Sequence, residues 1–241
     1  THSRPFSPEI AETANDLLEH MTDFRLKGLE GVEEDNTSAV LCRTNMGCLT
    51  EAIFLMEADT PFALEGGVDN EGFKMIEDIV SLSNGDTYNV RHPDLKGLRS
   101  IQEFEKELDE DLLNKEWKTS LRVIDKMGGI DKALSMVDQI KESQRKVPAD
   151  AVVITTMHKS KGKEWNTVRI ANDAESVFYR TGVDMMGRKV REAIEFKDAP
   201  VMEKNLFYVA VTRAKRNLSL GASERLFKHE ENANTVTNIA A

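Results

Sequence analysis

The chain has 241 residues, of which 40% are hydrophobic and 31% are charged, and its formal net charge is −10. This composition is typical of a globular protein with a sizeable core. No run approaches the ~18 apolar residues of a membrane span, and the N-terminus lacks the apolar core of a signal peptide. We therefore expect a cytoplasmic protein without a membrane partner.

The charge and the cysteines narrow the function further. An acidic balance argues against a general nucleic-acid coat, but it leaves room for a local cationic groove, because phosphate contacts depend on where Lys and Arg lie. Cys42 and Cys48 are too few for a disulfide framework and do not outline a zinc site. We expect both to be buried thiols.

The first third of the chain alternates helix and strand patterns. Ser7 before Pro8 is a suitable N-cap, and apolar residues at helical spacing predict a helix over 8–21. After a polar loop at 28–37, an apolar run at 39–42 predicts a strand with a polar tip at 43–45 and a helix behind it. A second short strand at 61–64 ends in a Gly-Gly turn, and a helix follows. Strand, polar tip and helix form the repeating unit of an α/β domain whose ligands gather at strand ends.

Residues 84–147 have a different character. Three amphipathic patterns at 100–113, 116–127 and 131–143 predict a mostly helical block inserted between the two strand-containing parts. Trp117 in this block is expected to be a core residue rather than a platform for stacked bases.

Beyond the block, residues 168–171 predict a strand, and residues 173–197 are expected to be irregular. This irregular part is basic and is either an ordinary loop or a phosphate contact; its cations are Arg180, Arg188, Lys189 and Arg191. A helix over 202–214 and a closing strand at 218–220 follow, and the tail from residue 229 is expected to fray.

Residues 151–165 hold the densest group of candidate ligands. The apolar run 151–154 predicts a buried strand that delivers the sequence TTMHKSKGKEW to a loop. Gly162 frees backbone N–H groups, and the hydroxyls and lysines around it suit phosphate oxygens, whereas Glu164 suits a sugar hydroxyl or a cation. By composition alone, the stretch also fits a strand that runs into an ordinary charged helix start.

Several stretches in this order resemble the UvrD/Rep/PcrA class of superfamily 1 helicases, especially their second RecA-like motor domain. Residues 155–165 are similar to motif V of that family, and residues 205–215 (NLFYVAVTRAK) are similar to motif VI. Residues 40–45 resemble motif IVa, and residues 66–68 with 76–79 resemble the family's Gly-Gly turn and following helix. Residues 1–6 with 8–11 resemble motif IV, best in the F-box helicase branch.

The resemblance implies an α/β fold, with a RecA-like parallel sheet flanked by helices and an inserted, mostly helical subdomain. In this division, residues 1–83 and 149–228 form the second RecA-like domain (2A), and residues 84–148 form a reduced 2B-like insertion. Residues 229–241 form a flexible tail.

The resemblance also implies a set of ATP contacts. Arg213 matches the motif VI arginine that stabilises the γ-phosphoryl group as an arginine finger. Motif IV of the family supplies a second arginine, but this chain has Pro5 at that position. Arg4, one residue earlier, is the candidate to take its role. Glu164 matches the motif V acid near the nucleotide ribose, and Gly162 keeps the backbone close to both ligands.

A second implied set contacts DNA. Thr155, Thr156 and His158 match positions that line the single-stranded DNA track, and Asn45 is a further candidate on it. Lys161 suits either the DNA backbone or a nearby acid. A loop that touches both ATP and DNA would couple nucleotide-dependent closure of two RecA-like domains to movement of the strand.

Together these features predict the C-terminal motor half of an ATP-dependent DNA helicase or translocase, with a DNA-repair type of activity. The sequence contains no Gly-x-x-x-x-Gly-Lys-Ser/Thr loop and no Asp-Glu pair at the end of an apolar strand. ATP and Mg²⁺ would therefore be bound mainly by an N-terminal RecA-like domain of the same protein, and the chain alone should not hydrolyse ATP. The chain starts at Thr1 and looks cut from a longer protein.

Two alternatives stay open at this point. The chain could be a stand-alone nucleic-acid or protein-binding module derived from a helicase domain, although a transition-state arginine has no use there. Residues 161–165 favour 3′ to 5′ translocation, as in the UvrD type, whereas residues 158–160 are also similar to the oppositely moving RecD-like branch.

Overall fold

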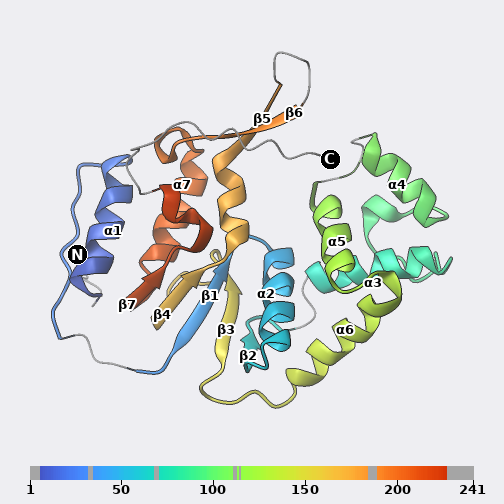
Figure 1. The fold of residues 1–241 in the computed structure, drawn as a ribbon, viewed down its shortest axis with the longest axis horizontal. Coiled ribbons are helices and arrows are strands. Elements are labelled where there is room, and N and C mark those ends of the chain that lie inside the picture. Colours follow the sequence, from blue (N-terminus) through green and yellow to red (C-terminus); the bar gives the residue numbers. More distant parts are fainter. Residues whose placement is uncertain are drawn as a thin grey trace.

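The computed structural model describes residues 6–31, 35–67, 71–110, 113, 115–183 and 189–226. Its centre is a five-stranded sheet in the order β2-β3-β1-β4-β7, with all neighbours parallel (Figure 1). The strands are β1 (Ser38–Cys42), β2 (Phe62–Leu64), β3 (Val152–Thr156), β4 (Trp165–Ile170) and β7 (Ala214–Ser219). The predicted α/β class is confirmed.

Helices cover both faces of this sheet. Helices α1 (Pro8–Glu19) and α7 (Val201–Val211) pack on one face, and α2 (Asn45–Glu57) packs on the other. Helix α3 (Glu71–Ser83) packs against α2 and extends the same hydrophobic cluster. Along β1, Ala39 and Leu41 join the α1/α7 core, while Val40 and Cys42 join the α2/α3 core. A strand buried on both faces carries a continuous apolar run, which is why residues 39–42 are readable from sequence. Cys42 and Cys48 are free, buried thiols, as predicted.

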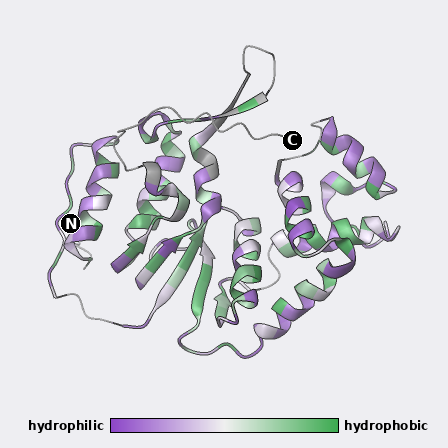
Figure 2. Cartoon of the chain, viewed as in Figure 1, coloured by the Kyte–Doolittle hydropathy of each residue, from purple (hydrophilic) through white to green (hydrophobic). Residues whose placement is uncertain are grey.

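A helical block follows α3. It consists of the 3₁₀ helix η1 (Pro93–Leu95) and the helices α4 (Ile101–Asp109), α5 (Lys115–Lys126) and α6 (Ile130–Ser143). Trp117 is fully buried there, and its indole Nε1 donates to Asp94 Oδ2 at 3.1 Å. Figure 2 shows both hydrophobic and hydrophilic colours on these helices, as expected for amphipathic segments.

The block shares one hydrophobic cluster with α2 and α3. Its helical character and the core position of Trp117 are therefore confirmed, while domain limits at residues 84 and 148 stay a prediction. Among the described residues, none of the helices has the length and apolarity needed to cross a bilayer.

The expectation of irregular structure over 173–197 is wrong for most of that segment. The chain forms a 3₁₀ helix η2 (Asn172–Phe178), a two-stranded antiparallel ribbon of β5 (Tyr179–Val183) and β6 (Lys189–Ala193), and η3 (Phe196–Asp198). The strands pair only with each other, so their sequences do not need the apolar alternation of a core strand. Arg188 lies outside the described residues.

The helix expected over 202–214 also ends early, at Val211. The Thr212 hydroxyl donates to the carbonyl groups of Tyr208 at 3.1 Å and Val209 at 2.9 Å, which occupies acceptors that a further helical turn would use. Strand β7 then begins at Ala214 and pairs with Trp165 of β4. Arg213 consequently lies in the turn between α7 and β7. The short helix η4 (Gly221–Leu226) follows β7.

Candidate functional site

The site is organised by the loop of residues 157–164, called here the crossover loop. It joins β3 to β4, which are parallel but not adjacent, because β1 lies between them. The chain must therefore return from the carboxyl end of β3 to the amino end of β4, a distance of roughly 17 Å for strands of this length. The crossover loop makes this return without a helix, so it runs from the carboxyl ends of the strands to their amino ends.

Internal hydrogen bonds fix the start of the crossover loop. The Ser160 backbone N–H donates to the Thr156 carbonyl at 3.0 Å, and the Ser160 hydroxyl donates to the Met157 carbonyl at 2.7 Å. Ser160 and Met157 are buried, so this hydroxyl holds the loop together instead of facing a phosphate. Gly162 has a φ of +88°, in the left-handed region that favours glycine. The loop is a folded element with His158 and Lys161 exposed on its outside.

Two of the three predicted ATP contacts in the described part of the chain, Glu164 and Arg213, meet at the amino ends of β4 and β7, and the third, Gly162, lies two residues before Glu164 on the crossover loop. Arg213 Nη1 donates to the Lys163 carbonyl at 3.1 Å, and the Trp165 N–H donates to the Arg213 carbonyl at 3.0 Å. Glu164 lies between these two bonded residues, so the predicted pair of Glu164 and Arg213 is brought together. Arg4 lies outside the described residues.

The Arg213 guanidinium is turned inward in this conformation. Its side chain also donates from Nε to the Val209 carbonyl at 2.8 Å and from Nη2 to the Thr212 hydroxyl at 3.0 Å, and the residue is 5% exposed. A guanidinium in this position can reach a phosphate only if it turns outward and releases the Lys163 carbonyl. The arrangement therefore ties Arg213 directly to the crossover loop.

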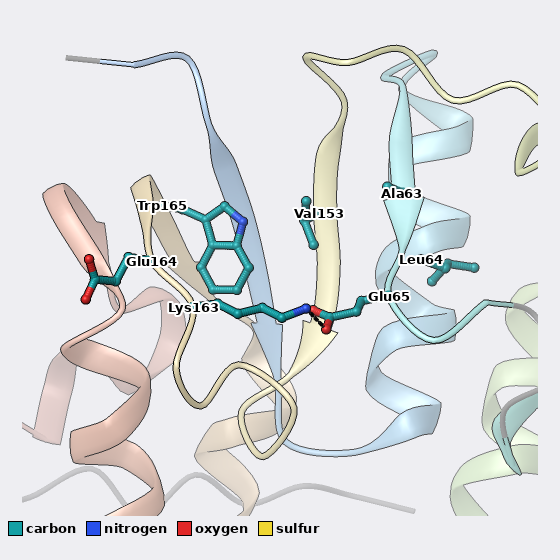
Figure 3. A pocket seen from close by; sticks show the side chains of 7 residues that line it. All are labelled: Ala63, Leu64, Glu65, Val153, Lys163, Glu164 and Trp165. Atoms are coloured by element: carbon teal, nitrogen blue, oxygen red, sulfur yellow. Dashed lines mark hydrogen bonds and ion pairs between the residues drawn. The ribbon is translucent and has the colours of Figure 1, made fainter. Parts of the chain in front are cut away.

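A cavity of about 490 Å³ opens beside the end of the crossover loop (Figure 3). Ala63, Val153 and Trp165 contribute apolar walls, and an ion pair joins Lys163 to Glu65 across it. The Glu164 carboxylate points away from that ion pair in Figure 3.

The donor set at this end fits only part of a nucleotide. The Glu164 carboxylate can accept hydrogen bonds from ribose hydroxyls, and the Arg213 guanidinium can bind one phosphate group. The cavity lining offers one lysine, which is already paired with an acid, and no cradle for a triphosphate. This agrees with a site completed by another domain.

The predicted DNA contacts gather at the opposite, carboxyl edge of the sheet. Strands β1 and β3 are adjacent, with Cys42 level with Thr156, so Asn45 and His158 follow neighbouring strand ends. His158 is exposed, and Asn45, the first residue of α2, is half-buried. Thr155 and Thr156 are buried in this conformation, and the Thr155 hydroxyl has no hydrogen-bond partner. The two threonines thus lie at the correct edge but beneath the surface.

Asp173 organises the tip of β1 and is a residue that the sequence analysis missed. Its carboxylate accepts from the backbone N–H groups of Arg43 and Thr44, both at 2.9 Å, and from the Thr44 hydroxyl at 3.0 Å. Burial raises the pKa of Asp173, and these hydrogen bonds oppose the increase. A β-carbon at Gly47 would overlap this carboxylate, so glycine is needed there. The only sequence signal was an acid two residues after the strand predicted at 168–171.

A second contact connects the same tip to α7. Arg43 binds Glu203 in a bidentate ion pair, with Nε to Oε2 at 2.8 Å and Nη2 to Oε1 at 2.6 Å. The Glu203 carboxylate raises the pKa of Arg43. Helix α7 begins near Glu203, and Arg213 follows its end. The Arg43–Glu203 pair is therefore a second physical link between the carboxyl ends and the amino ends of the parallel strands.

Comparison with known proteins places this geometry in a family. Residues 71–225 match the UvrD-like helicase C-terminal domain. The chain is 26% identical to F-box DNA helicase protein 1 of Schizosaccharomyces pombe (strain 972 / ATCC 24843), over 91% of the chain and 26% of that protein. It is 28% identical to F-box DNA helicase 1 of Gallus gallus, over 92% of the chain and 23% of that protein.

The chain spans about a quarter of the length of these relatives. The predicted resemblance and the RecA-like class of the sheet are confirmed, and the match covers well over half of the sequence. The chain belongs to the UvrD-like helicase C-terminal domain family.

Proposed function

We propose that the chain is the C-terminal motor half of an ATP-dependent DNA helicase or translocase that moves 3′ to 5′ along single-stranded DNA. The observation that carries this proposal is the crossover loop, which extends from His158 at one edge of the sheet to Glu164 and the Arg213 contact at the other. The names of the two F-box DNA helicases support the same function.

In this proposal, ATP and Mg²⁺ are bound mainly by the N-terminal RecA-like domain of the full-length protein. Hydrolysis places negative charge on the γ-phosphoryl oxygens, and bound Mg²⁺ supplies part of the compensating positive charge. Arg213 turns outward and adds a guanidinium to the same oxygens, while Glu164 accepts hydrogen bonds from the ribose.

The outward turn of Arg213 is the step that couples the two ligands. It breaks the bond to the Lys163 carbonyl, so the end of the crossover loop is freed when the arginine engages phosphate. His158 and Lys161 are exposed on the same loop, and in this proposal they contact the single-stranded DNA. In this proposal, the turn of Arg213 also moves α7, which ends just before it. The ion pair between Arg43 and Glu203 of α7 transmits that movement to the tip of β1, next to Asn45.

Residues 84–148 are, in the same proposal, a reduced 2B-like insertion between two parts of the 2A domain. The hydrophobic cluster that joins α4, α5 and α6 to α2 and α3 would make them move as one body with that domain.

Strand displacement by the full-length protein tests the proposal. Duplexes with a single 3′ or 5′ tail are mixed with protein and ATP, and we expect unwinding of the 3′-tailed duplex only. Unwinding of the 5′-tailed duplex alone would refute the polarity. Tight single-strand binding without any DNA-stimulated ATP hydrolysis would instead indicate a binding module derived from a helicase domain.

A further inference from the structure

Glu65 is a charged residue beside the crossover loop that the mechanism proposed above does not use. It directly follows β2, and its backbone N–H donates to the Ile154 carbonyl of β3 at 2.9 Å. The turn that follows is closed by a hydrogen bond from the Gly67 N–H to the Leu64 carbonyl at 3.0 Å. The Glu65 carboxylate is therefore attached to a fixed part of the sheet.

The crossover loop contacts this fixed point through two lysines. The Lys163 ammonium forms an ion pair with Glu65 Oε1 across the cavity (Figure 3). A β-carbon at Gly66 would lie 2.9 Å from Lys159 Nζ, so the ammonium of Lys159, near the start of the loop, lies over the turn that follows Glu65. Both ends of the loop thus contact residues 65–66.

Lys163 is held from three sides. Its N–H donates to the Ser160 carbonyl at 3.0 Å, its carbonyl accepts from Arg213 Nη1 at 3.1 Å, and its ammonium binds Glu65. Because the carbonyl and the side chain belong to one residue, the ion pair restricts where the carbonyl lies. Glu65 is thereby linked to the hydrogen bond that keeps Arg213 turned inward.

The character of this ion pair differs from that of a contact that only stabilises the fold. The Lys163 side chain is 48% exposed and the Glu65 side chain is 20% exposed, and pairs of this kind contribute little to stability. The second carboxylate oxygen, Glu65 Oε2, is buried and has no hydrogen-bond partner, which costs free energy. A weak pair with an unsatisfied acceptor can open and close during each cycle of a motor.

We propose that Glu65 is a positioning residue, which holds Lys163 and so keeps Arg213 turned inward until DNA is bound. Glu65 touches neither nucleotide nor DNA in this role and acts only through the Lys163 carbonyl. DNA on the exposed side of the loop draws the loop away from residues 65–66 and releases that carbonyl. The inference rests on the motor function proposed above and adds a control of its rate without DNA.

ATP hydrolysis by the full-length protein, with and without single-stranded DNA, tests the proposal. Glu65→Gln and Lys163→Met each remove one charge of the pair, and both variants keep the carbonyl of residue 163. We expect each to raise basal hydrolysis about threefold, which is within the range that a partly exposed ion pair supplies. The rate at saturating DNA should equal that of wild type, so the stimulation by DNA falls about threefold.

A matched control and a charge swap separate this role from an effect on folding. Lys141→Met breaks the ion pair between Lys141 of α6 and Glu77 of α3, whose side chains are 33% and 23% exposed, and it should leave basal hydrolysis unchanged. Glu65→Lys/Lys163→Glu rebuilds the pair with its charges reversed and should restore the wild-type basal rate.

The outcomes distinguish this proposal from the motor function on which it rests. An unchanged or lowered basal rate in either single variant, or a charge swap no closer to wild type than the single variants, would overturn the role of Glu65. Those results leave the motor function intact as long as DNA stimulates hydrolysis by the wild-type protein. Absence of that stimulation in the wild-type protein would overturn both.

Discussion

Arg213→Ala in the full-length protein separates a catalytic arginine from a structural one. Loss of an arginine finger lowers kcat by about 10³ to 10⁵, equivalent to about 4–7 kcal/mol of transition-state stabilisation. The structural part of the effect is smaller and follows from the hydrogen bonds of the guanidinium. The Val209 carbonyl keeps the Thr212 hydroxyl as a donor at 2.9 Å, whereas the Lys163 carbonyl loses the bond from Arg213.

Lys163 is exposed, so its carbonyl can accept from water, and losing the bond from Arg213 costs at most about 1–3 kcal/mol. Domains of this size are stable by about 5–15 kcal/mol, so the variant should remain folded and its unfolding cannot reproduce a thousandfold loss of kcat. The assay is DNA-stimulated ATP hydrolysis, measured together with single-strand affinity and thermal unfolding.

The control for this experiment is Arg216→Ala, which makes the same chemical change at an exposed position on β7. We expect Arg213→Ala to lose at least 10³ in kcat with single-strand Kd within about threefold of wild type. Arg216→Ala should retain kcat. A loss of kcat below about tenfold for Arg213→Ala, or a parallel loss of DNA affinity, would refute the role given to Arg213.

Three further predictions concern the carboxyl edge. His158→Ala should weaken DNA-stimulated ATP hydrolysis by the full-length protein more than basal hydrolysis, and equal losses would contradict a DNA contact on the crossover loop. A double-mutant cycle of Arg43→Ala and Glu203→Ala, followed by chemical denaturation, should give a coupling of about 1 kcal/mol for this partly exposed bidentate pair, and additive effects would exclude the link. Gly47→Ala should destabilise the chain by about 1–3 kcal/mol, because its methyl group meets the Asp173 carboxylate; unchanged unfolding in denaturant would show that the tip can relax.

Most of the regular elements could be predicted because their signals are local. The strand expected at 39–42 is found at Ser38–Cys42, and the helix expected at 131–143 is found at Ile130–Ser143. Both have strong apolar patterns against a core. The β5–β6 ribbon has no such pattern, since its stability comes from backbone pairing and a packed base, and it was consequently missed.

The candidate site divides in the same way. The types and spacing of residues around Glu164 and Arg213 led to the family, and the match over residues 71–225 confirms it. The role of Asp173 depends on contacts with residues about 130 positions away in the chain, so no local pattern could indicate it. The inward turn of Arg213 likewise depends on the Lys163 carbonyl, 50 positions away.

Sequence alone determined the alternation of strands and helices, the helical character of residues 100–143 and the motifs that resemble a helicase motor, because each depends on residues close together in the chain. Tertiary structure alone decided the path of the crossover loop. Strand β1 lies between β3 and β4, so the loop must cross the full height of the sheet. The resulting physical connection between His158 and Arg213 depends on this strand order, which hydrogen bonding among distant segments sets.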